Sequence, residues 1–316
     1  HEPARVGPRS HRRLRGAVGG AARRRGRLAA PRPAGGLRRI RDAQAGAREA
    51  TIYVSAVDQK GEPIPNLALE DVEVREDGVP REVLRVSHAV DPMDIAVLVD
   101  DSASSEGVIP RVREGLAAFN ATMNTGSNQL ALIALADRPH ILVDYTSTPD
   151  RFAKGIGLLW PRSQSGSTLL DALFEVSRGL QRRDTPRAII VAIVTDGGDF
   201  SSRRYEQTIA ELGRAQAALH VISVGNFTQL DDYELRNRAR MLSEGTTATG
   251  GQRVNVLTPT AVQPALERLA RELSSQYKVV FGRPESLIPP KKTDARARRT
   301  GLTLRGTLER ATGRPK

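Results

Sequence analysis

The chain has 316 residues, of which 39% are hydrophobic and none is cysteine, so disulfide and thiolate chemistry are excluded. Its longest apolar runs are about seven residues, well short of the ~20 that a membrane-spanning helix needs. The net charge is +12, but residues 1–50 hold 14 basic and 3 acidic residues, residues 283–316 hold 10 and 3, and residues 51–282 hold 24 and 30. The central part is therefore mildly acidic, which argues against a nucleic-acid-binding face on the folded body.

The first segment, residues 1–48, is rich in Arg, Ala, Gly and Pro and has no periodic apolar pattern, so we predict a disordered basic tail. Such a tail can contact phosphates or anionic lipid only nonspecifically. No signal peptide is readable, because the first 30 residues lack a continuous apolar stretch. The chain begins with His1 and not Met, so we expect a fragment or a processed product.

Residues 49–90 predict a small antiparallel β segment. Residues 51–57 have the composition of a strand, and residues 72–75 alternate apolar and charged side chains. Glu76, Asp77 and Gly78 then supply hairpin-turn chemistry before the apolar alternation of residues 83–86. Because so small a unit is marginal alone, we expect it to dock on the larger region that begins near residue 91.

Residues 91–282 alternate short apolar runs with amphipathic segments of about a dozen residues, a pattern typical of a parallel sheet covered on both faces. We therefore predict an α/β fold with a doubly wound, mostly parallel central sheet. The predicted strands are 94–99, 129–136, 140–144, 187–194, 218–224, 252–256 and 276–281. The predicted helices are 107–122, 150–159, 168–181, 205–217, 231–242 and 260–274. Residues 283–316 predict a basic linker, over 283–299, and a possible terminal strand.

Three short pieces of the predicted domain carry oxygen ligands of the kind that hold a hard divalent cation. Asp100, Ser102 and Ser104 follow the first apolar run, Thr168 opens a helical segment, and Asp196 follows the run over 188–194. The carboxyl ends of parallel strands meet at one edge of a sheet, so we expect these side chains to lie near each other. Hydroxyl and carboxylate oxygens are the ligands that Mg²⁺ prefers. The sequence thus predicts one magnesium site.

Each piece taken alone has a second interpretation. Ser102, Ser104 and Thr168 are also preferred helix-capping residues. Asp196, followed by two glycines, also fits an ordinary turn. Asp101 competes with Asp100 as a ligand, although only Asp100 has serines two and four residues later. It is the occurrence of all three pieces in order that favours a metal site.

These residues form the pattern D-x-S-x-S…T…D, and residues 91–282 therefore resemble a von Willebrand factor type A domain with its metal-ion-dependent adhesion site. The segments 58–61, 69–72, 76–78 and 275–277 make the chain similar to the bacterial VWFA-related (Acidobacteria-type) family, in which a short β segment precedes the domain. The resemblance implies a Rossmann-like fold. It also implies that the serines and the threonine ligate Mg²⁺ (or Mn²⁺ or Ca²⁺) directly, that the aspartates act largely through water, and that the protein is secreted or periplasmic.

The function expected from these features is non-catalytic. The domain would bind a protein partner whose acidic side chain completes the coordination of the metal, and it would not be an enzyme. One alternative is a metal-assisted phosphohydrolase, since Asp-rich strand ends also serve phosphoryl transfer; the absence of a Gly-rich phosphate loop argues against it. Another is a structural module with a vestigial metal site, in which residues 51–88 make the contacts. Nucleic acid is not an expected partner except nonspecifically through the basic tail.

Overall fold

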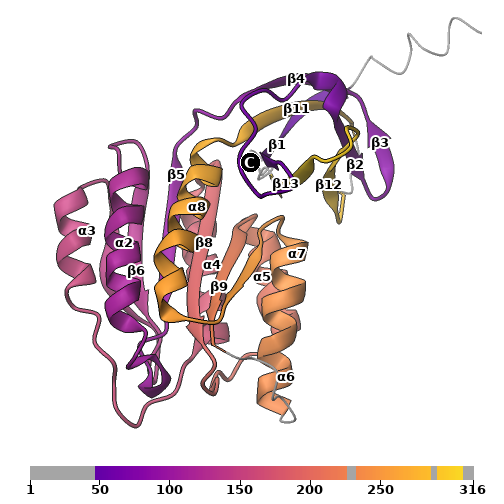
Figure 1. Ribbon diagram of the computed structural model, residues 1–316. Coiled ribbons are helices and arrows are strands. Elements are labelled where there is room, and N and C mark those ends of the chain that lie inside the picture. Colours follow the sequence, from indigo (N-terminus) through magenta and orange to yellow (C-terminus); the bar gives the residue numbers. More distant parts are fainter. Residues whose placement is uncertain (1–46, 226–232, 286–289, 309–316) are drawn as a thin grey trace, which may run out of the picture. The chain divides into compact units, whose positions relative to one another are not determined.

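The central element of the fold is a six-stranded, mostly parallel sheet that runs in the order β10-β9-β8-β5-β6-β7 (Figure 1). The structure is a computed structural model that describes residues 47–225, 233–285 and 290–308, so almost all of the predicted tail, 1–48, lies outside the described residues. All neighbours in this sheet are parallel except β6 and β7. Its strands are β5 (Met93–Val99), β6 (Gln129–Ala134), β7 (His140–Thr146), β8 (Arg187–Thr195), β9 (Ala218–Val224) and β10 (Arg253–Val256).

Helices cover both faces of this sheet, as predicted from the alternating pattern. They are α2 (Ile109–Met123), α3 (Pro149–Ile156), α4 (Leu169–Arg183), α5 (Tyr205–Ala215), α6 (Tyr233–Arg240), α7 (Thr246–Ala248) and α8 (Val262–Ser274). Short helical turns add η1 (Leu69–Asp71), η2 (Ala103–Ser105), η4 (Pro259–Ala261) and the π-helical η3 (Met241–Gly245). None of the helices in the described ranges is long and apolar enough to cross a membrane.

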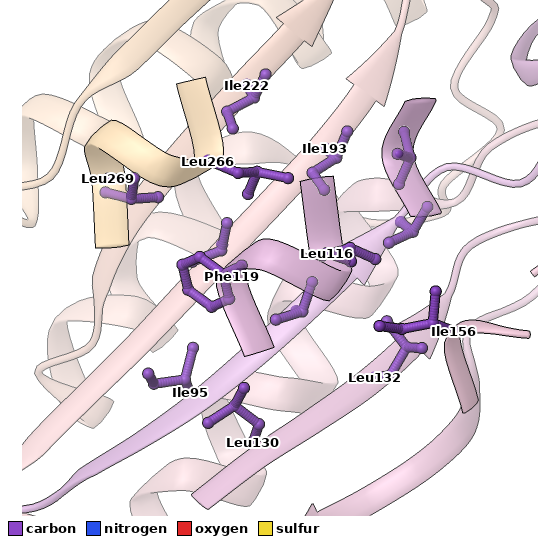
Figure 2. Close-up of a cluster of buried hydrophobic side chains, with 14 of the residues drawn as sticks. Ile95, Leu116, Phe119, Leu130, Leu132, Ile156, Ile193, Ile222, Leu266 and Leu269 are labelled. Atoms are coloured by element: carbon purple, nitrogen blue, oxygen red, sulfur yellow. The ribbon is translucent and has the colours of Figure 1, made fainter. Parts of the chain in front are cut away.

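Two hydrophobic cores lie on opposite faces of the sheet. The first joins β5, β6 and β8 to helices α2, α3 and α8, and Figure 2 shows Phe119 and Leu116 of α2 packed among its strands. The second joins the other face of the same strands to α4, α5 and η3. The strands are buried on both sides, which is why they appear in the sequence as continuous apolar runs.

The connections from β5 and β8 leave the sheet in opposite directions. After β5 the chain enters α2 on one face, and after β8 it enters α5 on the other, although β5 and β8 are neighbours. Loops that separate in this way leave a crevice at the carboxyl ends of adjacent strands, where ligands bind in open α/β sheets. Asp100 and Thr195 lie at this point.

A second sheet, antiparallel and in the order β13-β1-β11-β4, unites the two ends of the described chain. It consists of β1 (Ala47–Val57), β4 (Val83–His88), β11 (Tyr277–Pro284) and β13 (Thr303–Leu308), so the terminal strand suggested by the sequence exists. The strand predicted over 276–281 also forms, but as β11 it pairs with β1 and β4 and not with the parallel sheet. Apolar alternation identifies a strand but does not say which sheet it joins.

A third, three-stranded sheet corrects two further predictions. Its order is β12-β2-β3, with β12 (Thr293–Ala297), β2 (Val72–Glu76) and β3 (Val79–Arg81). The region 283–299, predicted as a linker, therefore contains a strand that pairs with β2. The hairpin turn forms where expected, with positive φ at Asp77 and Gly78, but its returning strand is β3 and not residues 83–86.

Buried polar contacts attach the antiparallel sheet to the α/β part, as expected for a β segment too small to stand alone. The Nη2 of Arg187, at the start of β8, donates to Oε1 of Gln276 at 2.7 Å. The amide of Gln276 in turn donates to Ser55 Oγ of β1 at 3.1 Å. All three side chains are buried.

Candidate metal centre

Asp100, the first residue after β5, joins the ends of the two central strands. Its Oδ2 accepts the Thr195 backbone N–H at 3.1 Å and the Thr195 hydroxyl at 2.6 Å, and its Oδ1 accepts the Ser102 N–H at 3.1 Å. The residue is 1% exposed. Asp100 therefore has a structural role as well as any role as a ligand.

Three hydroxyl groups form a hydrogen-bonded chain that ends on this carboxylate. Ser102 Oγ lies 3.0 Å from Ser104 Oγ, which lies 2.6 Å from Thr195 Oγ1. Because the single hydroxyl proton of Thr195 goes to Asp100, Ser104 must donate to Thr195, and Ser102 to Ser104. Every proton in the chain points inward, toward Asp100, and the lone pairs of Ser102 remain open.

Thr195 was not among the residues predicted to form the site. The only signal for it in the sequence is a hydroxyl residue at the last strand position before Asp196. Sequence patterns treat that position as part of a buried strand, and Thr195 is indeed 2% exposed. Its hydroxyl connects the first and third pieces of the predicted site.

Thr168 lies at the same edge of the sheet, immediately before α4. Its N–H and its hydroxyl both donate to the carbonyl of Leu135, at 3.0 and 2.7 Å. The preceding loop reaches the Asp100 loop through the N–H of Ala103, which donates to the Ser165 carbonyl at 3.3 Å. The hydroxyls of Ser102 and Thr168 thus belong to adjoining loops, although Thr168 is bonded to Leu135 and not to the serines.

The capping interpretation of Thr168 is wrong. Thr168 occupies the N-cap position of α4 but makes no side-chain capping hydrogen bond. Asp199 Oδ2 accepts the Leu169 N–H at 3.1 Å, and Ser201 Oγ accepts the next N–H at 2.9 Å. Burial raises the pKa of Asp199, opposed by its hydrogen bond from Ser201. The loop after β8 thus caps α4, and the Thr168 hydroxyl is used elsewhere. Ser102, at the N-cap of η2, likewise makes no side-chain capping bond.

Asp101 is held by the backbone of the neighbouring loop. Its Oδ1 accepts the N–H groups of Leu135 and Ala136 at 3.0 and 2.7 Å, and Oδ2 lies 3.4 Å from Nε of Arg162. Of the two adjacent aspartates, only Asp100 is bonded to the hydroxyl chain. The sequence left open whether Asp100 or Asp101 is the candidate ligand, and these contacts favour Asp100.

Asp196 is exposed at the same edge, one residue beyond Thr195. Its side chain lies over Gly225 at the end of β9, where a Cβ atom would come 2.6 Å from Asp196 Oδ2. Gly197 makes a similar close approach, because a Cβ there would lie 2.3 Å from Ser104 Oγ. Glycine at these two positions leaves the space that Asp196 and Ser104 occupy.

The chemistry of these groups suits a hard divalent cation. All the side-chain donors are oxygens, and the 3.0 Å between the two serine hydroxyls is close to the ~2.9 Å that separates adjacent ligands of an octahedral Mg²⁺ with bonds of about 2.0–2.1 Å. No group of three or more His, Cys, Asp or Glu side chains within the described ranges could hold a metal. A cation at this edge would therefore depend on hydroxyl ligands.

Comparison with protein families identifies the region that contains these residues. The family model of the von Willebrand factor type A domain matches residues 95–198, the segment that runs from β5 through the loop after β8. This chain contains a von Willebrand factor type A domain. Domains of this family generally serve in protein interaction and adhesion.

Solved structures resemble the type A domain only distantly. BatB from Bacteroides thetaiotaomicron is 15% identical, with 58% of this chain and all 100% of that chain covered and a TM-score of 0.42. The SpRpn10 VWA domain is 17% identical, with 54% and 92% covered and a TM-score of 0.42. The pilus adhesin SpaC from Lactobacillus rhamnosus GG is 12% identical, with 78% and 47% covered and a TM-score of 0.47. No curated protein matches the chain in sequence.

A cavity of about 470 Å³ adjoins the hydroxyl cluster in the type A domain. Ala103, between the two serines, is part of its wall, and the exposed Trp160 is another. The guanidinium of Arg113 lies 4.1 Å from the centre of the Trp160 ring. The cavity therefore has walls of mixed aromatic and charged character, and it meets the Ser102–Ser104 segment at Ala103.

Proposed function

We propose that the type A domain is a divalent-metal-dependent protein-binding module. In this proposal Asp100, Ser102, Ser104, Thr168 and Asp196 hold Mg²⁺, with Mn²⁺ or Ca²⁺ as substitutes, directly or through water. The remaining coordination position accepts a carboxylate from a protein partner. The chain acts by binding and performs no catalysis.

The observation that carries the proposal is the direction of the hydrogen bonds at the sheet edge. Ser102 donates to Ser104, Ser104 donates to Thr195, and Thr168 donates to the Leu135 carbonyl. Each of these hydroxyls therefore uses its proton within the protein and keeps lone pairs with which it can bind a cation. Capping of α4 does not compete for them, since Asp199 and Ser201 perform it.

The balance of charge supports the expected kind of partner. Hydroxyl ligands are neutral, so a site with three of them and two carboxylates leaves the bound metal electrophilic. Mg²⁺ also retains several waters, which an external ligand can displace. A partner's Asp or Glu side chain supplies the oxygen and the negative charge that such a metal accepts.

The phosphohydrolase alternative receives less support. Asp100 would be its nucleophile, but this residue is 1% exposed and its carboxylate accepts three hydrogen bonds. Its position also changes how the site should be tested. Asp100→Ala would remove these bonds and free the ends of β5 and β8. Asp100 variants therefore cannot separate binding from folding.

The test is a calorimetric titration of the full chain with Mg²⁺ and Mn²⁺, using variants at exposed positions. Ser104→Ala and Asp196→Asn remove candidate ligands, and Ser163→Ala and Asp137→Asn are matched controls on neighbouring loops. We expect one saturable site, at least tenfold weaker in the first pair and unchanged in the controls. Wild-type protein that takes up no cation, or equal binding by all four variants, would refute the proposal.

Partner binding is tested separately. A pull-down from native lysate with and without Mg²⁺, using wild-type protein beside Thr168→Ala, should recover a protein only when both the metal and the threonine are present. Recovery that persists in EDTA would favour a structural module with a vestigial site. Release of phosphate from an aryl phosphate, lost in the exposed-site variant Asp196→Asn, would instead revive the enzyme alternative.

A further inference from the structure

A buried arginine, Arg238, binds the backbone on both sides of Asp196, directly after β8. Arg238 on α6 is 2% exposed. Its Nη2 donates to the carbonyl of Thr195, and its Nη1 donates to the carbonyl of Gly197. These are the carbonyls on either side of Asp196, so one guanidinium holds the backbone of that residue in place.

The charge of Arg238 is balanced by the acidic groups of the candidate centre. Burial lowers its pKa, and Asp199, Asp100 and Asp196 oppose that effect through their charges. Arginine nevertheless remains charged in proteins, and a buried charge is tolerated only when it is paired and hydrogen-bonded. Arg238 therefore places a fixed positive charge near the carboxylates that would bind the metal.

A second arginine adds to the positive field of this region. Arg253 on β10 is half-buried and donates to Ser223 Oγ at 3.0 Å; burial lowers its pKa, and the charge of Arg238 lowers it further. The two guanidinium groups therefore influence each other.

From this arrangement, which rests on the proposed metal site, we propose that Arg238 is a built-in counter-cation of the type A domain. It holds the Asp196 loop in its binding geometry when no metal is present, and it lowers the affinity of the centre for divalent cations. The carboxylates then stay together when no metal is bound. The centre binds metal only at higher metal concentrations than the same ligand oxygens would need without the positive charge of Arg238.

Two substitutions separate the charge of Arg238 from its hydrogen bonds. Arg238→Gln removes the charge. Arg238→Lys keeps the charge but cannot donate to both carbonyls in the geometry of the guanidinium. Arg240→Gln is the matched control, because Arg240 is exposed on the same helix and donates to the Tyr205 hydroxyl. Calorimetric titration with Mg²⁺ measures affinity, and thermal unfolding in EDTA measures the metal-free state.

We expect Arg238→Gln to bind Mg²⁺ about tenfold more tightly than wild type, because it removes a unit charge that repels a dication at short range. The same variant should melt at a lower temperature in EDTA and gain more from added Mg²⁺. Arg238→Lys should melt lower as well but keep the wild-type affinity within about twofold, since the charge is kept. Arg240→Gln should change neither. If Arg238→Gln does not fold, Arg238→Met carries the same expectation.

The outcomes distinguish this inference from the function on which it rests. Cation binding by the wild type with equal or weaker binding by Arg238→Gln would overturn the inference alone. A gain of affinity in Arg238→Lys or Arg240→Gln as large as in Arg238→Gln would also overturn it. No binding by the wild type or by any variant would overturn both, whereas binding by Arg238→Gln and not by the wild type would refute the proposed function of the wild-type domain while supporting the effect of Arg238.

Discussion

His220 makes the stability of the fold depend on pH in a predictable direction. It lies in the middle of β9 and is 1% exposed. Neither of its ring nitrogens has a hydrogen-bond partner within the described residues. Burial lowers the pKa of His220 from 6.5 to about 4, opposed by the charge of Glu272. His220 is therefore a residue of the buried core.

The sign and size of the effect come from this shift. The folded state holds His220 as a neutral imidazole, whereas the unfolded chain protonates it near pH 6.5. The contribution of His220 to the free energy of unfolding is therefore fully present above pH 6.5 and is lost as the pH falls toward 4. A pKa difference of about 2.5 units corresponds to roughly 3 kcal/mol, at about 1.4 kcal/mol per unit. At pH 5 about 2 kcal/mol should already be lost.

Urea unfolding of wild type and His220→Leu between pH 4 and 8 measures the effect. We expect the wild type to lose stability relative to the variant as pH falls below 6.5, with a difference that grows by about 1.4 kcal/mol per pH unit. His88→Leu, an exchange of an exposed histidine, controls for the loss of an imidazole. Parallel stability curves for wild type and His220→Leu would refute the reasoning.

Three further substitutions test the local structure. Gly197→Ala places a Cβ 2.3 Å from Ser104 Oγ, so Mg²⁺ titration should show at least tenfold weaker binding, and unchanged affinity would contradict a role for Ser104. Asp199→Ala removes the acceptor for the Leu169 N–H and a charge that offsets the burial of Arg238, so it should cost at least about 1 kcal/mol in urea unfolding; equal stability would mean that neither contact contributes. Gly179→Ala, inside α4 with no atom within 4 Å of the new Cβ apart from neighbouring residues and the helix backbone, should stabilise the protein by about 0.5–1 kcal/mol in the same assay, and a loss would reveal a missed contact.

The α/β part of the fold was predictable because its signals are local. Strands buried on both faces appear as continuous apolar runs such as 95–99, and helices as segments with an apolar side. The strand pairing of the chain ends was not predictable. Nothing near Tyr277 indicates that β11 pairs with β1, more than 200 residues earlier, because pairing depends on contacts between distant segments.

The candidate centre shows the same division between local and distant information. Asp100, Ser102 and Ser104 were found because their spacing places small oxygens directly after a strand. Thr195 was missed because it is the last residue of its own strand, and Arg238 because it arrives from α6, 42 residues beyond Asp196. The ligand pattern is local in sequence, whereas the groups that hold it in place are brought there only by the fold.

The hydroxyl protons decide which kind of ligand this edge can accept. An anion such as a phosphate needs side-chain donors, but the protons of Ser104 and Thr168 are directed to Thr195 and to the Leu135 carbonyl. Reversing them would remove one hydrogen bond to the Thr195 hydroxyl and one to the Leu135 carbonyl, at a cost of about 0.5–1.5 kcal/mol for each. The carboxylate of Asp100 at the end of the chain fixes the direction, because an ionised carboxylate can only accept. The edge therefore presents lone pairs, and this is the property on which the proposed cation site depends.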